Sequence, residues 1–144
     1  MAWQKALVTC VAAMTLASGA KAEDTFNLVC DGQTQIVVPA ILKDETKPYH
    51  KVYRVDLGKK TWCEADCPTI FNFADVSPTQ LVFFDETIDA PSTYSKTREA
   101  VSRTDGTHSI FAQSGVGING VTMSSKGQCE KAPFTGFPTP ETKF

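Results

Sequence analysis

The strongest constraint on the fold is a period-two alternation of apolar and polar residues. Within YHKVYRVDL, residues 49–57, the side chains of Tyr53, Val55 and Leu57 alternate with polar ones, and FNLVC at 26–30 repeats the pattern. Such alternation is typical of a strand with one face in the core and one in water. Because no segment shows a convincing helical period, the sequence predicts an all-β protein.

Turn signals divide the chain into short pieces that suit antiparallel pairing. Asp105-Gly106 lies between two alternating runs and supplies the positive φ that a tight hairpin needs. Pro39 is expected at a strand end, because proline cannot donate to a sheet. We expect further strands at 34–40, 69–73, 81–86 and 119–131. About eight short strands joined in this way predict a small antiparallel barrel or sandwich.

The first 22 residues have the form of a secretory signal peptide. Lys5 precedes an apolar run at 6–17, and Ala20 and Ala22 form the A-x-A pattern of a signal-peptidase site. We therefore expect cleavage after Ala22 and a periplasmic or secreted location. The apolar run is well short of the ~20 residues that span a bilayer, so no membrane span is expected. The predicted organisation is a signal peptide at 1–22, a single β domain at 23–131 and an irregular tail at 132–144.

Removal of that peptide leaves an even number of cysteines. They are Cys30, Cys63, Cys67 and Cys129, and an even set in a small exported chain indicates disulfides. Of the three possible pairings we favour Cys63 with Cys67 and Cys30 with Cys129, which joins the first strand to the last. In the chain-entropy model, closing a loop of about 100 residues is worth about 4.7 kcal/mol, and closing one of about five residues about 2 kcal/mol. The long bond would then contribute most to stability, while the short bond would shape a turn.

Cys63 and Cys67 also admit a second interpretation, as a thiol redox pair or a metal site. The sequence CEADCP at 63–68 is similar to the C-x-x-x-C-P of copper chaperones of the SCO type, in which two thiolates and a distant histidine hold copper. Zinc held by these cysteines with His50 and His108 is arithmetically possible. The surrounding strands and the following proline favour a turn instead, and free thiolates in an oxidising compartment tend to be lost to disulfide. The preferred interpretation is a structural disulfide, with no metal and no cofactor.

Net charge and motif content limit the classes of function. The formal net charge of −2 becomes −4 without Lys5 and Lys21, whereas binding to a phosphate backbone needs a basic patch. No nucleic-acid partner is expected. The sequence also lacks the G-x-S-x-G, H-E-x-x-H and P-loop motifs, so it gives no support for an enzyme, and no catalytic residue is assigned.

The candidate binding surface comes from loops and from one aromatic residue. GVGING at 115–120 matches G-x-G-x-x-G, but the β-like run that follows it predicts a glycine-rich turn in place of a nucleotide site. The polar stretch 85–96 is expected to be a long loop. Trp62 beside Cys63 is expected in the core, and would be a contact residue if it were exposed. The candidate residues are Trp62, Tyr94, Ser114, Gly115, Gly117 and Gly120.

Two resemblances accompany these patterns. FNLVCDG at 26–32, YRVDLGKKTWCEADC at 53–67 and GQCEKAPFTGFP at 127–138 look like segments of small exported proteins of unassigned function from Gram-negative bacteria. That resemblance implies a bacterial envelope location and a scaffold, but no catalytic residue. A second resemblance is to periplasmic C-type lysozyme inhibitors, small β-barrels that insert an S-G-x-[KR]-[YF] loop into the enzyme. Here Ser114-Gly115 is followed by Val-Gly-Ile, without the basic and aromatic residues.

The leading hypothesis is therefore a non-catalytic binding or structural module that contacts another envelope protein or a small ligand. A thiol redox or metal-binding role for Cys63 and Cys67 is the alternative, and a lysozyme-inhibitor-like role is a further one.

Overall fold

The computed structural model describes residues 24–138 of the chain. The predicted signal peptide, its cleavage site after Ala22 and residues 139–144 lie outside the described part. Within that part the strands are β1 (Thr25–Val38), β2 (Lys43–Asp56), β3 (Thr61–Glu64), β4 (Phe71–Asn72), β5 (Asp75–Val76), β6 (Gln80–Ala90), β7 (Thr93–Ser102), β8 (Thr107–Ser114) and β9 (Val121–Ala132), with the short 3₁₀ helices η1 (Pro39–Ile41) and η2 (Gly117–Asn119).

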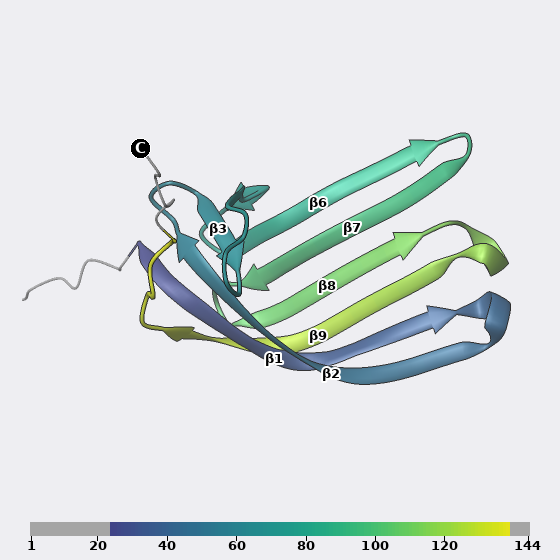
Figure 1. Ribbon diagram of the computed structural model, residues 1–144, viewed down its shortest axis with the longest axis horizontal. Coiled ribbons are helices and arrows are strands. Elements are labelled where there is room, and N and C mark those ends of the chain that lie inside the picture. The colour runs from purple at the N-terminus through teal and green to yellow at the C-terminus, as the bar shows by residue number, and fades with distance from the viewer. Residues whose placement is uncertain (1–23, 139–144) are drawn as a thin grey trace, which may run out of the picture.

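The described strands form one antiparallel sheet of nine strands in the order β4-β3-β2-β1-β9-β8-β7-β6-β5. The sheet curls into a half-barrel (Figure 1), which confirms the predicted all-β antiparallel class. The first strand lies beside the last because β1 pairs with β9 from Asn27 and Ala132 to Val37 and Thr122. None of the helices in residues 24–138 has the length and apolar character needed to cross a bilayer.

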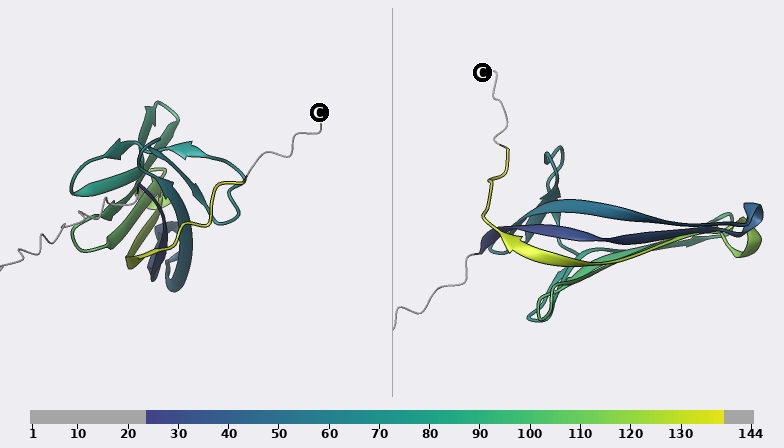
Figure 2. Two further views of the ribbon diagram at one scale, coloured as in Figure 1. Left: turned by 90° about the vertical axis from the view of Figure 1, so that its left-hand side faces the viewer. Right: turned by 90° about the horizontal axis from the view of Figure 1, so that it is seen from below.

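The two ends of this sheet differ in shape. We call the end that holds β3, β4, β5 and the β7–β8 turn the rolled end, and the end that holds the β1–β2, β6–β7 and β8–β9 turns the flat end. Near the flat end the three hairpins overlap as one thin layer when seen from below, whereas toward the rolled end the strands separate into two walls (Figure 2). The hydrophobic core fills the space between those walls.

Aromatic side chains dominate the core at the rolled end. The ring of Tyr53 on β2 lies 4.6 Å from that of Phe83 on β6, and the ring of Trp62 on β3 lies 4.9 Å from Phe83. Trp62 is 1% exposed, so the core interpretation of this residue is the one that the structure supports. Aromatic contacts at these separations add to the stabilisation from burial alone, so the two walls are held together mainly here.

The disulfides are those favoured from the sequence. Cys30 pairs with Cys129 across β1 and β9, where the two residues are register partners, and Cys63 pairs with Cys67 across the turn that follows β3. All four residues are buried. The first bond links the two strands that are furthest apart in the sequence among the described elements.

Strand lengths and one connection differ from the sequence expectation. β1 and β2 have 14 residues each. β1 is long because the two strand segments predicted at 26–30 and 34–40 join into one continuous strand, which ends at Val38. The prediction of a long loop at 85–96 is wrong. Residues 85–90 continue β6 and 93–96 begin β7, joined by a tight turn. Backbone pairing with the partner strand therefore outweighed the polar composition of this stretch, since a half-exposed sheet tolerates polar side chains.

Residues 133–138, the described part of the C-terminal tail, lie against β1 and β2 at the rolled end. Asn27 donates from Nδ2 to Oγ1 of Thr135 at 3.0 Å, and Arg54 donates from Nη1 to the carbonyl oxygen of Gly136 at 2.8 Å. Residues 133–138 have no regular secondary structure, but these bonds hold them against β1 and β2.

Candidate functional site

The ends of two hairpins meet at the flat end. The β1–β2 turn contains η1 and the β8–β9 turn contains η2, and the two short helices contact each other. The β6–β7 turn at residues 91–92 lies at the same end of the molecule (Figure 1). We call residues 39–42 and 115–120 together the tip.

The tip is aliphatic and exposed. Leu42 is 95% exposed, Ile41 and Ile118 are each 68% exposed and Val116 is 65% exposed. Neither η1 nor η2 carries an acidic residue in its first turn or a basic one in its last. Four large aliphatic side chains thus lie exposed on two contacting turns with no charge among them, and exposed apolar patches mark interaction sites.

Leu42 is presented by an unusual backbone conformation. Its φ of 52° lies in the left-handed region, which costs a non-glycine residue roughly 1–2 kcal/mol. Because its side chain is almost wholly in water, packing does not explain why leucine stands here. Such a conformation persists only where the surrounding structure supports it, and here its effect is to display an aliphatic side chain.

Several backbone donors of the tip are already paired. Leu42 donates its N–H to the carbonyl oxygen of Pro39 at 3.1 Å, and Gly120 donates to Gly117 at 3.0 Å. Gly115 donates to the carbonyl oxygen of Tyr94 at 2.9 Å, which ties the tip to the neighbouring hairpin. Satisfied backbone groups lower the cost of placing this surface in an apolar environment.

The candidate surface residues separate into two groups. Tyr94, Ser114, Gly115, Gly117 and Gly120 all lie at the flat end, where Tyr94 and Gly115 line one shallow pocket together. Trp62 lies in the core at the rolled end and is not part of that surface. GVGING forms the β8–β9 turn, with positive φ at Gly115 and Gly117, as expected of a glycine-rich turn.

Four polar side chains form a hydrogen-bonded chain across the interior of the sheet, from β2 to β7 and β8. Tyr49 and His108 are joined at 2.9 Å between the phenolic oxygen and Nδ1, and His108 lies 3.1 Å through Nε2 from Oε1 of Glu99. Tyr53 donates its hydroxyl hydrogen to the same carboxylate oxygen. His108 is wholly buried and Glu99 is 5% exposed. The chain connects β2 with β7 and β8 across the interior.

Two glycines make room for Tyr49. Gly32 and Gly127 are register partners on β1 and β9, and a Cβ atom on either would collide with the Tyr49 side chain and with the backbone of the partner strand. The tyrosine therefore lies across both strands on its way from β2 to His108. Glycine is required here for close approach, not for turn formation.

The charge state of this chain follows from its surroundings. Burial alone would raise the pKa of Glu99, but hydrogen bonds from His108 and Tyr53, with the nearby positive charge of Lys51, hold that pKa below its ordinary value. Burial, followed by the Glu99 charge, raises the pKa of Tyr53 and of Tyr49. Glu99 is therefore a carboxylate at neutral pH, and both tyrosines stay protonated as donors.

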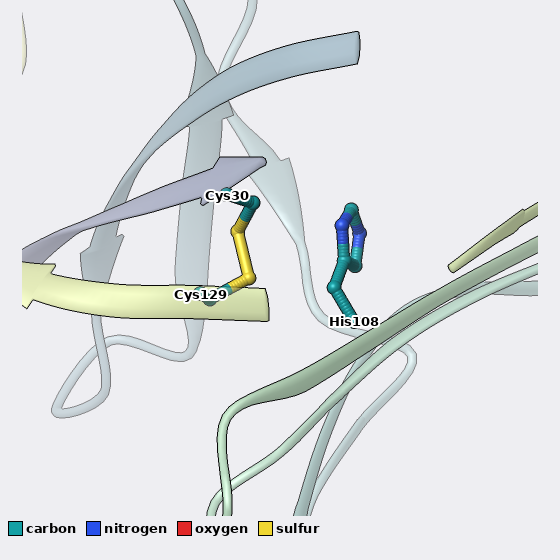
Figure 3. Close-up of side chains that lie close together, drawn as sticks. All are labelled: Cys30, His108 and Cys129. Carbon is teal, nitrogen blue, oxygen red and sulfur yellow. A yellow bond between two sulfur atoms is a disulfide. The ribbon is translucent and has the colours of Figure 1, made fainter. Parts of the chain in front are cut away.

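The Cys30–Cys129 disulfide lies next to His108 (Figure 3). The two sulfur atoms and an imidazole nitrogen lie within 4.8 Å of one another, which makes this trio the one group of potential metal ligands that converges among residues 24–138. In the disulfide, neither sulfur is a thiolate, and thiolates are what a soft metal requires. The zinc set considered from the sequence does not assemble, since His50 faces outward and bonds to Asp31 at 2.7 Å.

Sequence reasoning missed two of these features. The sequence interpretation considers His108 only as a possible zinc ligand, but the residue is buried, and its shared parity with Ile110 on β8 is the signal for that burial. The aliphatic turn PAIL at 39–42 was also missed. Its signal is four apolar residues at a hairpin turn, where glycine, asparagine and aspartate are usual.

No protein-family model matches the chain, and neither a curated protein nor a solved structure matches it.

Proposed function

We propose that this protein is an exported, non-catalytic binding module that attaches through its tip to the surface of a lipid bilayer. The observation that carries the proposal is the group of four exposed aliphatic side chains on two contacting hairpin ends. The two disulfides support an oxidising compartment such as the periplasm or the exterior, where membrane surfaces are accessible.

The chemistry of the tip favours lipid over protein. The residues that dominate protein interfaces are tryptophan, tyrosine and arginine, while leucine and valine are under-represented. The exposed side chains here are leucine, isoleucine and valine. The surrounding charge is mixed, with Lys43, Asp44 and Asp89 close in sequence to the turns, so a zwitterionic surface fits better than an anionic one.

The sheet edges offer a less suitable contact. Residues 43–51 of β2 pair with β1 but with no other described strand, because β3 pairs only with the later part of β2. This free edge contains Lys43, Lys47, Lys51 and Pro48, and charges with proline are the means by which exposed edges avoid strand addition. Binding is therefore assigned to the tip in preference to the edges.

The expected strength of membrane attachment is modest. Full burial of one large aliphatic side chain is worth about 1.5–3 kcal/mol, so the four side chains of the tip supply several kcal/mol before immobilisation is counted. A single myristoyl chain binds membranes reversibly, with a constant of about 10⁴ M⁻¹. We expect reversible attachment of comparable strength.

The test is flotation of the mature protein with phosphatidylcholine vesicles. Leu42→Asn with Ile118→Asn removes two of the exposed side chains, and asparagine tolerates the left-handed φ at position 42. The double variant is expected to bind at least tenfold more weakly than the wild-type chain. Ile70→Asn is the matched control, because Ile70 is 49% exposed but lies in the turn region of the rolled end.

Two results would contradict the proposal. If wild-type protein does not float with vesicles, lipid is the wrong partner, and a photo-reactive residue at position 118 can then report a protein partner in the envelope. If the double variant and the control bind equally well to the wild type, the tip is the wrong surface.

The other hypotheses have less support. A redox role for Cys63 and Cys67 requires an attacking thiol to reach their sulfurs, but both residues are buried. A role like that of the lysozyme inhibitors would use residues 114–118, which lie at the flat end. The side chains of Val116 and Ile118 in this segment are aliphatic and carry no positive charge that could enter an acidic cleft.

A further inference from the structure

The rolled end contains a pocket that the tip does not explain. The pocket has a volume of about 280 Å³ and opens between the beginning of β1, the end of β9 and the β7–β8 turn. It lies at the opposite end of the sheet from the tip (Figure 1). Any ligand held there would be separate from a membrane contact at the flat end.

Apolar side chains form one part of the pocket lining. Phe26 and Leu28 from β1, Leu81 from β6 and Val101 from β7 form its walls with Leu57. The strands that carry these side chains belong to both walls of the half-barrel, which separate at this end (Figure 2). An apolar body placed between them would extend the core rather than cover the outer surface.

The rim of the pocket is cationic. Lys131 and Arg103 belong to the lining, which contains no aspartate or glutamate. Lys131 lies on the same side of β9 as Cys129 but is exposed, and its Nζ lies 4.8 Å from the centre of the Phe26 ring. Arg103 donates from Nη1 to the carbonyl oxygen of Ser77 at 2.7 Å, which fixes its guanidinium group near the opening.

Neither cation has a carboxylate partner within residues 24–138. Lys43, Lys47, Lys51, Lys59 and Arg98 form ion pairs with acidic side chains in the described part of the chain, whereas Lys131 and Arg103 do not. Two cations without a carboxylate partner in this range therefore lie at one opening, in a chain whose net charge is −2. The charge at this opening is thus complementary to an anion, and the walls are complementary to an apolar body.

We propose that the pocket binds a small amphiphilic anion, an aliphatic carboxylate of about eight carbons, with its chain between the two walls and its carboxylate between Lys131 and Arg103. The volume supports this size, since 280 Å³ holds about nine non-hydrogen atoms at ~30 Å³ each, the share of a water in the liquid. A ligand of this size binds with a dissociation constant in the millimolar range or below.

The first experiment compares three probes of equal chain length on the mature wild-type protein. Octanoate, 1-octanol and octylammonium share the apolar body and differ in head-group charge. Titration followed by backbone amide chemical shifts is expected to show octanoate binding tightest and octylammonium weakest. The shifts should fall at Phe26, Leu28, Gly106 and Cys129. Shifts confined to the tip, or equal affinity for the three probes, would overturn the assignment.

The second experiment removes the rim charges. Lys131→Gln and Arg103→Gln are each expected to weaken octanoate binding about five- to tenfold and to leave 1-octanol binding unchanged. Lys126→Gln is the matched control, because Lys126 is an exposed lysine on the same strand that faces away from the pocket. If the rim variants match the control, the carboxylate does not bind where we place it. Because vesicle flotation depends on the tip, failure of either proposal leaves the other intact.

Discussion

The two ends of the molecule place their large apolar side chains in opposite environments. The rolled end contains the fully buried ones, Trp62, Tyr53 and Phe83 among them, together with both disulfides. The flat end contains the most exposed ones, Leu42, Ile41, Ile118 and Val116. A sheet with an apolar side normally buries it against a second layer. Within residues 24–138, that second layer is present at the rolled end only.

The flat end is held together by pairing within a single layer. β1 stays paired with β2 to Val38 and Lys43, at the foot of the tip. Side chains add links across the strands, including Gln35 to Asp44 at 2.9 Å and Thr34 to Ser125 at 2.8 Å. The difference between the ends implies a division of roles, in which the rolled end supplies stability and the flat end supplies contact.

The largest expected effect is on the free energy of unfolding, which the two disulfides of the rolled end should stabilise by different amounts. Cys30→Ala with Cys129→Ala should lower the free energy of unfolding by about 4.7 kcal/mol, because that bond closes a loop of about 100 residues in the unfolded chain. Cys63→Ala with Cys67→Ala should lower it by only about 2 kcal/mol. Urea unfolding of the two double variants measures the ratio. Equal losses would show that local packing, and not loop closure, determines what each bond contributes.

Much of the rolled end could be predicted from the sequence. Alternation at 49–57 and 26–30 identified the strands that carry Tyr53, Leu28 and Cys30 to the interior, and Asp105-Gly106 identified the β7–β8 hairpin. These signals are local, because alternation reports which face of one strand is buried. The disulfide preference also held, since it needed only that the first and last strands be neighbours.

The flat end and the polar chain could not be predicted in the same way. Whether 85–96 is loop or hairpin depends on register with the partner strand, and the polar composition of that segment does not report register. The Tyr49–His108–Glu99 chain joins three strands through a gap over Gly32 and Gly127. Such a contact depends on how far the sheet curls, which no single strand encodes.

A second prediction concerns acid stability at the rolled end. The pKa of Glu99 is held below its ordinary value by His108 and Tyr53, against the opposing effect of burial. Its contribution to stability is therefore present above pH ~4.3, the ordinary value for glutamate, and is lost as pH falls through the lower pKa of the folded state. Lys51 faces the same carboxylate from β2 and acts in the same direction.

Glu99→Gln tests this assignment. The substitution should lower the free energy of unfolding at pH 7 by about 2 kcal/mol, the cost of leaving one buried hydrogen-bonding group poorly paired. It should also flatten the decline in stability below pH ~4.3. Glu86→Gln on the exposed part of β6 is the control and should change neither quantity. Thermal unfolding across pH 2–7 measures both; an unchanged acid profile in Glu99→Gln would exclude the buried carboxylate as the acid-sensitive group.

The smallest expected effect on stability comes from Leu42→Gly. This substitution tests directly whether the rolled end supplies stability and the flat end supplies contact. Leu42→Gly should relieve the left-handed strain of roughly 1–2 kcal/mol, less the greater freedom of glycine in the unfolded chain, about 0.5–1 kcal/mol. Because Leu42 is 95% exposed, no packing is lost, so the free energy of unfolding should rise by up to about 1.5 kcal/mol. Vesicle binding should weaken at the same time.

Lys60→Gly supplies the matched comparison at the rolled end. Lys60 has a φ of 56°, is exposed, and lies in the β2–β3 turn, so glycine should give a similar gain in stability there. It should leave vesicle binding unchanged, because the turn is remote from the tip. If both variants gain stability and only Leu42→Gly loses binding, then strain at the flat end is maintained for contact, whereas strain at the rolled end is only a turn conformation. If Leu42→Gly binds vesicles as well as the wild type, the exposed leucine has no role in attachment. The left-handed conformation at Leu42 would then be only a turn conformation, as it is at Lys60.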